Sequence, residues 1–427
     1  MKRVVDKMRT LLVDGPASVT LVSGDLCVLG APLNVEETIV VRQGKRLPLW
    51  TETGATFEIM LGEGASVNEF EESAVPSSWS DAANELLSLE KPVAVLVLGG
   101  VDSGKTSFCT FLVNEAVKNG LRTGVIDADL GQSDVGPPST VGFNFVTKPV
   151  KDLFEIDAKD VVFVGSTSPS GTITAIMDGL TYLKQESLEA GADFVVINTD
   201  GWIENDEATE YKVQLIEHVA PSVVVGIQQE NKLEQIIDRL TDVKCFVVES
   251  PQLVQSRNRE KRKILRELGY KKYMKGAKML SISFGWIKVT GSLLGSGAPV
   301  HHSRLATLID MLGVRPVYSE ESLSAVLVVL KRGTVFAEKD VKDVEDYFGK
   351  RLKLIWEGDE NGLLVGLKDE EDHFLGIGIL QDVDYKRKNL KIYTPVTQKV
   401  GSLSFGQIKL NKNLKEIGLS TVYSKTL

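Results

Sequence analysis

The chain has 427 residues, of which 43% are hydrophobic and 25% charged, and its formal net charge is −9 at pH 7. This composition excludes a disordered chain and is typical of a globular protein with two or three domains. The acidic balance excludes a protein coated in basic surface, so any nucleic-acid contact must be local. No apolar run approaches the roughly 20 residues of a membrane span, so no membrane partner is expected.

Residues 1–90 are predicted to form a small β domain. Short strand-like segments such as Val19–Val22 and Thr38–Arg42 alternate with turn-forming glycines. The acidic and Ser-rich stretch from Asn68 to Asp81 is interpreted as a linker that leads into a short helix near Ala82–Leu89.

From residue 91 to residue 278, apolar strands alternate with helical stretches. This alternation is typical of parallel strands joined by crossover helices, in a sheet that is buried on both faces. The predicted class is therefore α/β, with a parallel sheet at its centre. The expected strands are Val93–Leu98, Gly124–Asp127, Val161–Val164, Phe194–Ile197, Val223–Ile227 and Cys245–Val248.

Residues 279–427 are predicted to be β-rich. Leu280–Trp286 alternates with period two, and Phe374–Ile379 is strand-like, while helices are expected near Leu305–Leu312 and Val341–Phe348. The pair His301-His302 lacks nearby Cys or acidic partners, so we expect a plain loop there and not a metal site.

The most informative motif is a phosphate-binding loop between the strand Val93–Leu98 and a helix predicted over Ser107–Asn119. The motif has the pattern G-x-x-x-x-G-K-[ST], whose glycines let backbone N–H groups face a triphosphate. Lys105 adds charge at the β- and γ-phosphates, and the Thr106 hydroxyl can bind Mg²⁺. We therefore expect a nucleoside triphosphate and Mg²⁺ here, with the nucleotide held by Gly99, Gly100, Val101, Asp102, Ser103, Gly104, Lys105, Thr106 and Ser107.

Two acidic residues, Asp127 and Asp129, follow the second predicted strand. Ligands gather at the carboxyl ends of parallel strands, so these acids are expected beside the phosphate loop. One carboxylate near Mg²⁺ and one that takes a proton from an incoming hydroxyl would equip a kinase. A pair of solvated strand-end acids is the alternative.

Two further loops also follow predicted strands. The first, Ser166–Gly171, is either an ordinary helix-capping loop or a contact for a substrate phosphate. The second, Asn198–Trp202, ends in an aromatic residue, Trp202, that can stack on a base or pack in the core.

Ser256–Lys278, called the basic segment here, carries ten Lys and Arg residues against two Glu residues. Arg259, Arg262 and Arg266 are spaced to share one helical face. The segment is either a solvated helix or, as we predict, a lid that neutralises the transferring phosphoryl group and the substrate backbone.

Taken in order, these motifs resemble the polynucleotide 5′-hydroxyl kinases, a family that includes the kinase subunit of the pre-mRNA cleavage factor, rRNA-processing kinases and stand-alone archaeal members. The resemblance covers most of residues 91–278. Its marks are the phosphate loop, Asp129–Gln132, Ser168–Gly171, Asn198–Trp202 and the arginines Arg262 and Arg266. The sequence departs from the family at Gly100-Val101, where members often carry Pro-Thr, and at Asp127, where some carry Glu.

The resemblance implies an N-terminal β-sandwich, the central kinase domain and a C-terminal domain, here expected to be mostly β. It implies that ATP and Mg²⁺ are used to phosphorylate the 5′-OH ends of RNA or DNA. By carry-over, Asp129 is the catalytic carboxylate and Trp202 stacks on a nucleobase. Lys105, Arg262 and Arg266 are expected to take part in catalysis with Asp129, and Thr106 and Asp127 are expected to bind the metal. The expected substrate contacts are Gln132, Ser168, Pro169, Ser170, Gly171, Trp202, Lys271 and Lys272.

Three other functions stay open at this point. The first is a catalytically silent, ATP-binding scaffold for an RNA-processing complex, against which the intact Lys105 and Asp129 argue. The second is a partner-activated ATPase with a lysine directly after the first loop glycine, where this chain has Gly100. The third is a metabolite kinase, which the basic segment disfavours. The sequence names no protein partner. Isolated cysteines and the absence of a visible signal peptide predict a cytoplasmic location.

Overall fold

The computed structural model describes residues 1–228, 230–252, 257–291, 294–335 and 338–420. The chain forms two compact units, Met1–Gly269 and Tyr270–Leu427, and each is described by itself. Among the described residues, no helix combines the length and the apolar character needed to cross a membrane.

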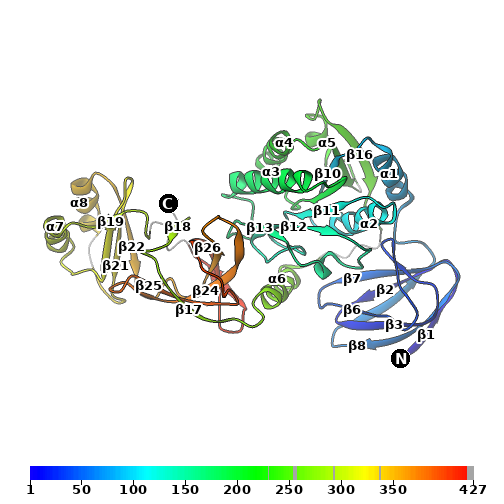
Figure 1. The fold of residues 1–427 in the computed structure, drawn as a ribbon, viewed down its shortest axis with the longest axis horizontal. Helices are drawn as coiled ribbons and strands as arrows, with labels where there is room; N and C mark the ends of the chain where they lie inside the picture. The colour runs from blue at the N-terminus through cyan, green and yellow to red at the C-terminus, as the bar shows by residue number, and fades with distance from the viewer. Residues whose placement is uncertain (229, 253–256, 292–293, 336–337, 421–427) are drawn as a thin grey trace. The chain divides into compact units, whose positions relative to one another are not determined.

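The first unit begins with two antiparallel sheets that share one core (Figure 1). Side chains along β3 (Ala17–Gly24) and β7 (Arg46–Thr51) alternate between buried and partly exposed, as expected for sheets with one face in a core. This arrangement confirms the predicted N-terminal β-sandwich. The first sheet also holds β1 (Lys2–Val5), β8 (Ala55–Leu61) and β6 (Thr38–Val41); the second holds β5 (Ala31–Pro32), β4 (Cys27–Val28), β2 (Arg9–Asp14) and β9 (Ser66–Phe70).

The stretch interpreted as a linker is more ordered than predicted. Strand β9 occupies its start, and helix α1 (Ser77–Ser88) begins five residues before the expected Ala82. Pro76 stands at the N-cap, where its missing N–H costs no hydrogen bond. Trp79 is fully buried against Phe108, with ring centroids 5.2 Å apart, so apolar packing explains the earlier start.

A seven-stranded sheet forms the centre of the first unit, in the order β13-β12-β11-β14-β10-β15-β16. Six of the strands were predicted, whereas β12 (Thr140–Val146) was missed. It pairs antiparallel with both β11 and β13, so β13 still runs in the same direction as the parallel strands. The others are β10 (Val93–Gly99), β11 (Thr123–Asp127), β13 (Asp160–Phe163), β14 (Phe194–Asn198), β15 (Val223–Gln228) and β16 (Lys244–Glu249).

Helices cover both faces of this sheet, and alternate residues of β10 point to opposite layers. Val93, Val95 and Val97 join the core shared with the β-sandwich, α1 and α2 (Lys105–Lys118). Ala94, Leu96 and Leu98 join the layer under α3 (Ile173–Glu189), α4 (Asp206–Val219) and α5 (Glu234–Ile237). A short 3₁₀ turn (Leu153–Glu155) precedes β13. This layering confirms the predicted α/β class.

A buried ion-pair cluster joins the β-sandwich to the α/β part. Arg42 contacts Asp134 at 2.9 Å and Asp152 at 2.7 Å, while Lys45 contacts Asp134 at 2.6 Å. The nearby cations hold the pKa of Asp152 well below its usual range, although burial acts in the opposite direction. The cluster therefore fixes the loop that follows β11.

Helix α6 (Arg259–Tyr273) contains residues of both units, since the first unit ends at Gly269. The second unit holds two further sheets, in agreement with the predicted β-rich character. One contains β17 (Lys278–Ser283), β25 (Asn389–Thr394), β24 (Phe374–Asp384), β23 (Leu363–Lys368), β26 (Ser402–Leu410), β18 (Lys288–Thr290) and β27 (Glu416–Leu419). The other contains β19 (Ala298–Pro299), β20 (Tyr318–Glu321), β21 (Ala325–Leu330) and β22 (Arg351–Trp356).

Both helices predicted for the second unit are present, as α7 (His302–Leu312) and α8 (Glu338–Phe348). They bury Leu308 and Val344 in a core with β21. The loop predicted at His301-His302 is wrong in part, because His302 is the first residue of α7 and His301 is its N-cap.

Candidate functional site

The phosphate loop connects β10 to α2 at the carboxyl end of the sheet. Strand β10 is buried along its whole length, and it pairs in parallel with β14 on one side and β15 on the other. Asp102 and Gly104 have positive φ values of 57° and 97°. A glycine is favoured at position 104 because a Cβ there would lie 2.9 Å from Pro251 Cδ. The loop backbone is thus fixed by its flanking elements.

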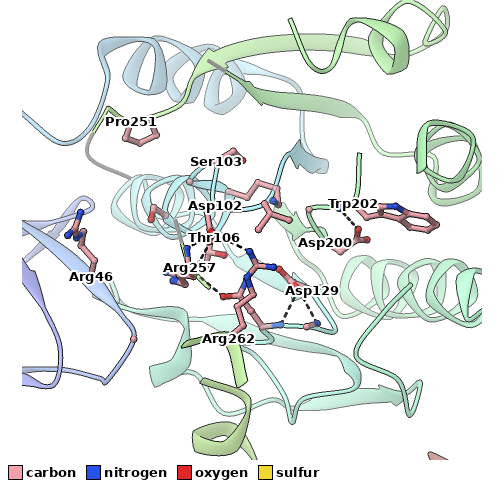
Figure 2. Close-up of a pocket in the computed structure, with 18 of the residues that line it drawn as sticks. Arg46, Asp102, Ser103, Thr106, Asp129, Asp200, Trp202, Pro251, Arg257 and Arg262 are labelled. Carbon is pink, nitrogen blue, oxygen red and sulfur yellow. Dashed lines mark hydrogen bonds and ion pairs between the residues drawn. The ribbon is translucent and has the colours of Figure 1, made fainter. Parts of the chain in front are cut away.

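A cavity of about 290 Å³ opens in front of this loop (Figure 2). It is lined by seven of the nine residues predicted to hold the nucleotide, namely Val101, Asp102, Ser103, Gly104, Lys105, Thr106 and Ser107. Gly99 and Gly100 are not among the lining residues. Their carbonyl oxygens accept hydrogen bonds from Lys105 Nζ, at 2.9 and 2.7 Å.

Lys105 is 6% exposed. Burial lowers the pKa of its ammonium group, and the nearby Asp129 carboxylate partly opposes this shift. A cation held on two carbonyl oxygens inside a cavity can exchange those bonds for bonds to an anion. Lys105 therefore provides the local positive charge that a phosphate group needs.

Asp129 lines the same cavity, two residues after β11. Its Oδ1 accepts hydrogen bonds from the N–H groups of Gly131 and Gln132, both at 3.1 Å. Burial raises the pKa of this carboxyl group, Lys105 lowers it, and Asp200 raises it. The carboxylate is thus held by its own loop, close to the charge of Lys105.

Asp127 lies behind Asp129 and does not line the cavity. Its side chain is fully buried, and its two oxygens accept hydrogen bonds from the backbone of Asp129, Asp134 and Val135 and from Asn198 Nδ2, at 2.6–3.2 Å. Burial, followed by Asp129 and Asp134, raises its pKa to about 7. This geometry fits a residue that positions the Asp129 loop better than it fits the metal ligand predicted from the sequence.

The loop after β13 brings only part of the predicted contact set to the cavity. Ser168 and Pro169 line it, together with Thr167. Ser170 and Gly171 are exposed and are not among the lining residues. Thr172 N donates to Pro169 O at 2.8 Å, so the loop also forms the turn that leads into α3. Both interpretations of this loop, capping and substrate contact, keep a structural basis.

The turn after β14 places Asp200, Gly201 and Trp202 at the cavity. A Cβ at Gly201 would lie 2.7 Å from the backbone of Val101, so the turn packs directly on the phosphate loop. Trp202 is half-buried, with its ring centroid 5.8 Å from that of Tyr211. It therefore packs on the protein with one part and lines the cavity with another, on the side of Figure 2 opposite Arg46.

Residues 257–266, called the arginine segment here, bring three guanidinium groups to the cavity. Arg257 N donates to Asp102 Oδ2 at 2.7 Å, and its Nη1 donates to Gln132 Oε1 at 3.1 Å. Arg262 Nη2 lies 3.6 Å from Asp102 Oδ2. Arg266 Nη1 donates to Gly131 O at 3.2 Å. The segment therefore bridges the phosphate loop and the Asp129 loop (Figure 2).

Several buried polar atoms at this cavity have no hydrogen-bond partner in the described part of the chain. They are Asp102 Oδ1, Ser103 Oγ and Arg262 Nε. Buried polar groups are nearly always hydrogen-bonded, so unpaired atoms that cluster at one cavity indicate that it takes a polar ligand.

The lysines predicted to bind the polynucleotide backbone, Lys271 and Lys272, belong to the second unit, and their role stays a prediction. Ser256, the first residue of the basic segment, lies outside the described residues.

The sequence analysis assigned no role to several residues that line the cavity, among them Asp200, Arg257, Pro251 and Arg46. Asp200 belongs to the motif Asn198–Trp202, and Arg257 belongs to the basic segment. The sequence therefore pointed to both residues, although neither was assigned a role. Pro251 and Arg46 belong to no motif that the sequence analysis identified. Arg46 comes from the β-sandwich, where Asp14 pairs with its Nε and Nη2, both at 2.7 Å. Only the packing of the β-sandwich on the α/β part brings it to the cavity.

Several known proteins are similar to this chain in sequence. The sequence family described as "mRNA cleavage and polyadenylation factor CLP1 P-loop" matches residues 99–276. A polyribonucleotide 5′-hydroxyl-kinase of Pyrococcus horikoshii is 30% identical over 348 residues, which are 81% of this chain and 93% of that protein. One of Methanocaldococcus jannaschii is 28% identical over 351 residues, which are 81% of this chain and 94% of that protein.

A solved structure of a Clp1p–Pcf11p complex contains a chain with a similar fold. The TM-score is 0.66 at 12% sequence identity, and the match covers 96% of this chain and 97% of that one. At this identity the similarity establishes the fold, in which a P-loop α/β part is combined with flanking β-rich parts.

Proposed function

This chain belongs to the family of the polyribonucleotide 5′-hydroxyl-kinases, and on that premise we propose that it transfers the γ-phosphate of ATP to the 5′-hydroxyl end of RNA. The observation that carries the proposal is a single cavity lined by a phosphate loop, a carboxylate and three arginines. Phosphoryl transfer needs positioning and charge stabilisation more than covalent chemistry, and these groups supply both.

The cavity fits a nucleoside triphosphate. Lys105 and the N-terminal end of α2 place positive charge at the loop, and Ser103 Oγ is a buried hydroxyl with a free bonding position. In this proposal Lys105 Nζ leaves the carbonyl oxygens of Gly99 and Gly100 and donates to the β- and γ-phosphate oxygens.

The cavity also fits a Mg²⁺ ion. Thr106 and Asp129 both line it and offer oxygen ligands. Magnesium keeps several water ligands and takes few protein ligands, so the Thr106 hydroxyl would suffice together with water and substrate phosphate oxygens. When bound, the ion neutralises charge that develops on the phosphate oxygens. We therefore assign Thr106 to the metal, with Asp129 beside it and Asp127 as the residue that holds the Asp129 loop.

Asp129 is the group best placed to act on the acceptor. In our proposal its carboxylate accepts the proton of the 5′-hydroxyl group while the oxygen attacks the γ-phosphorus. The hydrogen bonds from Gly131 and Gln132 fix Oδ1 and leave Oδ2 for this task. Burial raises the pKa of Asp129, which makes the carboxylate a better base than an exposed aspartate.

Two of the three arginines stabilise charge on the transferring group, and the third holds the segment. In the proposal Arg262 and Arg266 turn from Asp102 Oδ2 and Gly131 O to the phosphoryl oxygens, whose charge and geometry a guanidinium group matches. Arg257 donates to both Asp102 and Gln132, and it keeps the segment in place.

The decisive experiment is transfer of labelled γ-phosphate to matched oligonucleotides with a 5′-hydroxyl end, as RNA, as DNA and as duplexes. We expect labelling of RNA, and the DNA arm measures acceptor preference. An RNA that already carries a 5′-phosphate is the matched control and should stay unlabelled. ATP binding without transfer to any acceptor would support the scaffold, and faster transfer to a free nucleoside would support the metabolite kinase.

A further inference from the structure

Behind the cavity, Asp200 is bonded by two side chains that the proposed chemistry does not use. Its Oδ2 accepts hydrogen bonds from Tyr211 Oη at 2.9 Å and from Lys212 Nζ at 2.8 Å. Lys212 Nζ also donates to Asp200 O at 3.1 Å, and Asp200 Oδ1 accepts from Trp202 N at 2.9 Å. Asp200 itself lines the cavity, so the set links α4 to the site.

Stability alone does not explain this cluster. The Lys212 side chain is 0% exposed and that of Asp200 is 7% exposed, so both charges are removed from water. The cost of desolvating two charges often exceeds their attraction, and apolar replacements are often neutral or stabilising. Removing only one partner is costly, because the other charge is then buried alone.

The cluster controls a turn that contacts two parts of the cavity. Gly201 packs on the phosphate loop at Val101, where an added Cβ would come within 2.7 Å of the backbone. Trp202 follows directly, its N–H is fixed by Asp200, and its ring lies against the Tyr211 ring at an interplanar angle of 32°. Three hydrogen bonds to Asp200 from α4 thus set the orientation of the turn between the nucleotide loop and Trp202.

We propose that Lys212 and Tyr211 are positioning residues, which act through Asp200 to hold Trp202 in the place where the polynucleotide acceptor is used. This inference rests on the proposed function, because it places the acceptor on the Trp202 side of the cavity. Neither residue lines the cavity, so both act through Asp200.

The main test is the double variant Asp200→Asn/Lys212→Met, which removes both charges together. We expect its thermal stability to be retained and its ATP affinity to change less than about twofold. The kcat/KM for a 5′-hydroxyl RNA should fall by about 10²-fold, the loss expected from a misplacement of about 1 Å. Melting temperature, nucleotide binding and RNA kinetics are measured on the full chain.

Tyr211→Phe is the conservative partner variant. It keeps the ring that packs on Trp202 and removes one hydrogen bond to Asp200, so we expect a smaller loss in the same direction. Glu210→Gln is the matched control. Glu210 lies on the same helix, α4, and the change removes its exposed ion pair with Arg239. The control should behave like the unaltered protein.

Each outcome decides the proposal. Unchanged kcat/KM in a stable double variant overturns it, as does an equal loss of ATP affinity and RNA use, which would assign the turn to the nucleotide loop. If the double variant is unstable, Tyr211→Phe decides, since native RNA kinetics in this variant would also overturn the proposal. Failure of the unaltered protein to phosphorylate any 5′-hydroxyl end contradicts the proposed function itself, and is therefore distinguishable.

Discussion

The phosphate loop and the arginine segment border the same cavity, but the fold holds them in different ways. The loop follows a fully buried strand and runs into a helix with nine buried residues, so its backbone is fixed from both sides. In the arginine segment, the side chain of Arg262 is 32% exposed, and its Nη2 lies 3.6 Å from Asp102 Oδ2. Partly exposed ion pairs contribute little stability. The loop is thus a preorganised element, whereas the arginines can exchange partners when phosphate binds.

The variant Lys105→Ala gives the sharpest test of the preorganised phosphate loop. We expect phosphate transfer to be abolished, because the variant loses the only Lys or Arg charge within the Gly99–Thr106 loop itself. Folding should change little, because Lys105 lines the cavity and faces the ligand. Transfer assays and thermal melts measure both effects. Near-native turnover would mean that the loop does not carry the chemistry.

The single variants Arg262→Ala and Arg266→Ala test whether the arginine segment exchanges partners when phosphate binds. A guanidinium group that stabilises the transition state is worth about 10³-fold or more in rate, so kcat should fall on that scale. ATP affinity in the absence of RNA should be nearly unchanged, because in the proposal Arg262 and Arg266 act on the charge that develops on the transferring group in the transition state. An equal loss of ATP affinity and kcat would show that the arginines bind the nucleotide as the phosphate loop does. The two regions would then not differ in function.

Asp129 and Asp127 are expected to have different roles in the site. Asp129→Asn should slow transfer by about 10²- to 10⁴-fold, the usual contribution of a general base, and leave ATP binding measurable. Asp127→Asn should also slow transfer, by disturbing the Asp129 loop, and added Mg²⁺ should not restore the rate. A magnesium titration of both variants distinguishes the roles, since recovery of Asp127→Asn at high Mg²⁺ would favour the metal-ligand role predicted from the sequence.

The smallest effect is expected at the lysines that follow the arginine segment. Neutralising Lys271 and Lys272 should raise the RNA KM, flatten its dependence on salt and leave kcat nearly unchanged, because contacts with the phosphate backbone release counterions. A salt titration of KM and kcat is compared with that of Arg266→Ala. Identical behaviour would indicate one undifferentiated basic surface and no separate lid.

The sequence determined the features that depend on short stretches of chain. Buried strands, the helix after Lys105 and the loop between them follow from apolar runs and glycine positions, and they were predicted closely. Motifs at the carboxyl ends of parallel strands could be assigned to one site, since topology brings such ends to one edge of the sheet. The missed strand β12 runs antiparallel to its neighbours and carries no motif.

The tertiary structure decided which polar residues face the cavity. Asp127 and Asp129 stand two positions apart and look equivalent in the sequence, yet four donors enclose the first and leave the second at the cavity. Arg46 reaches the site from a separate β-sandwich, and Lys212 reaches Asp200 from a helix. Such contacts depend on how distant elements pack, and local patterns of apolar and polar residues do not encode them individually. The motifs therefore indicated the kind of chemistry, whereas the packing of the elements decided which residue takes which role.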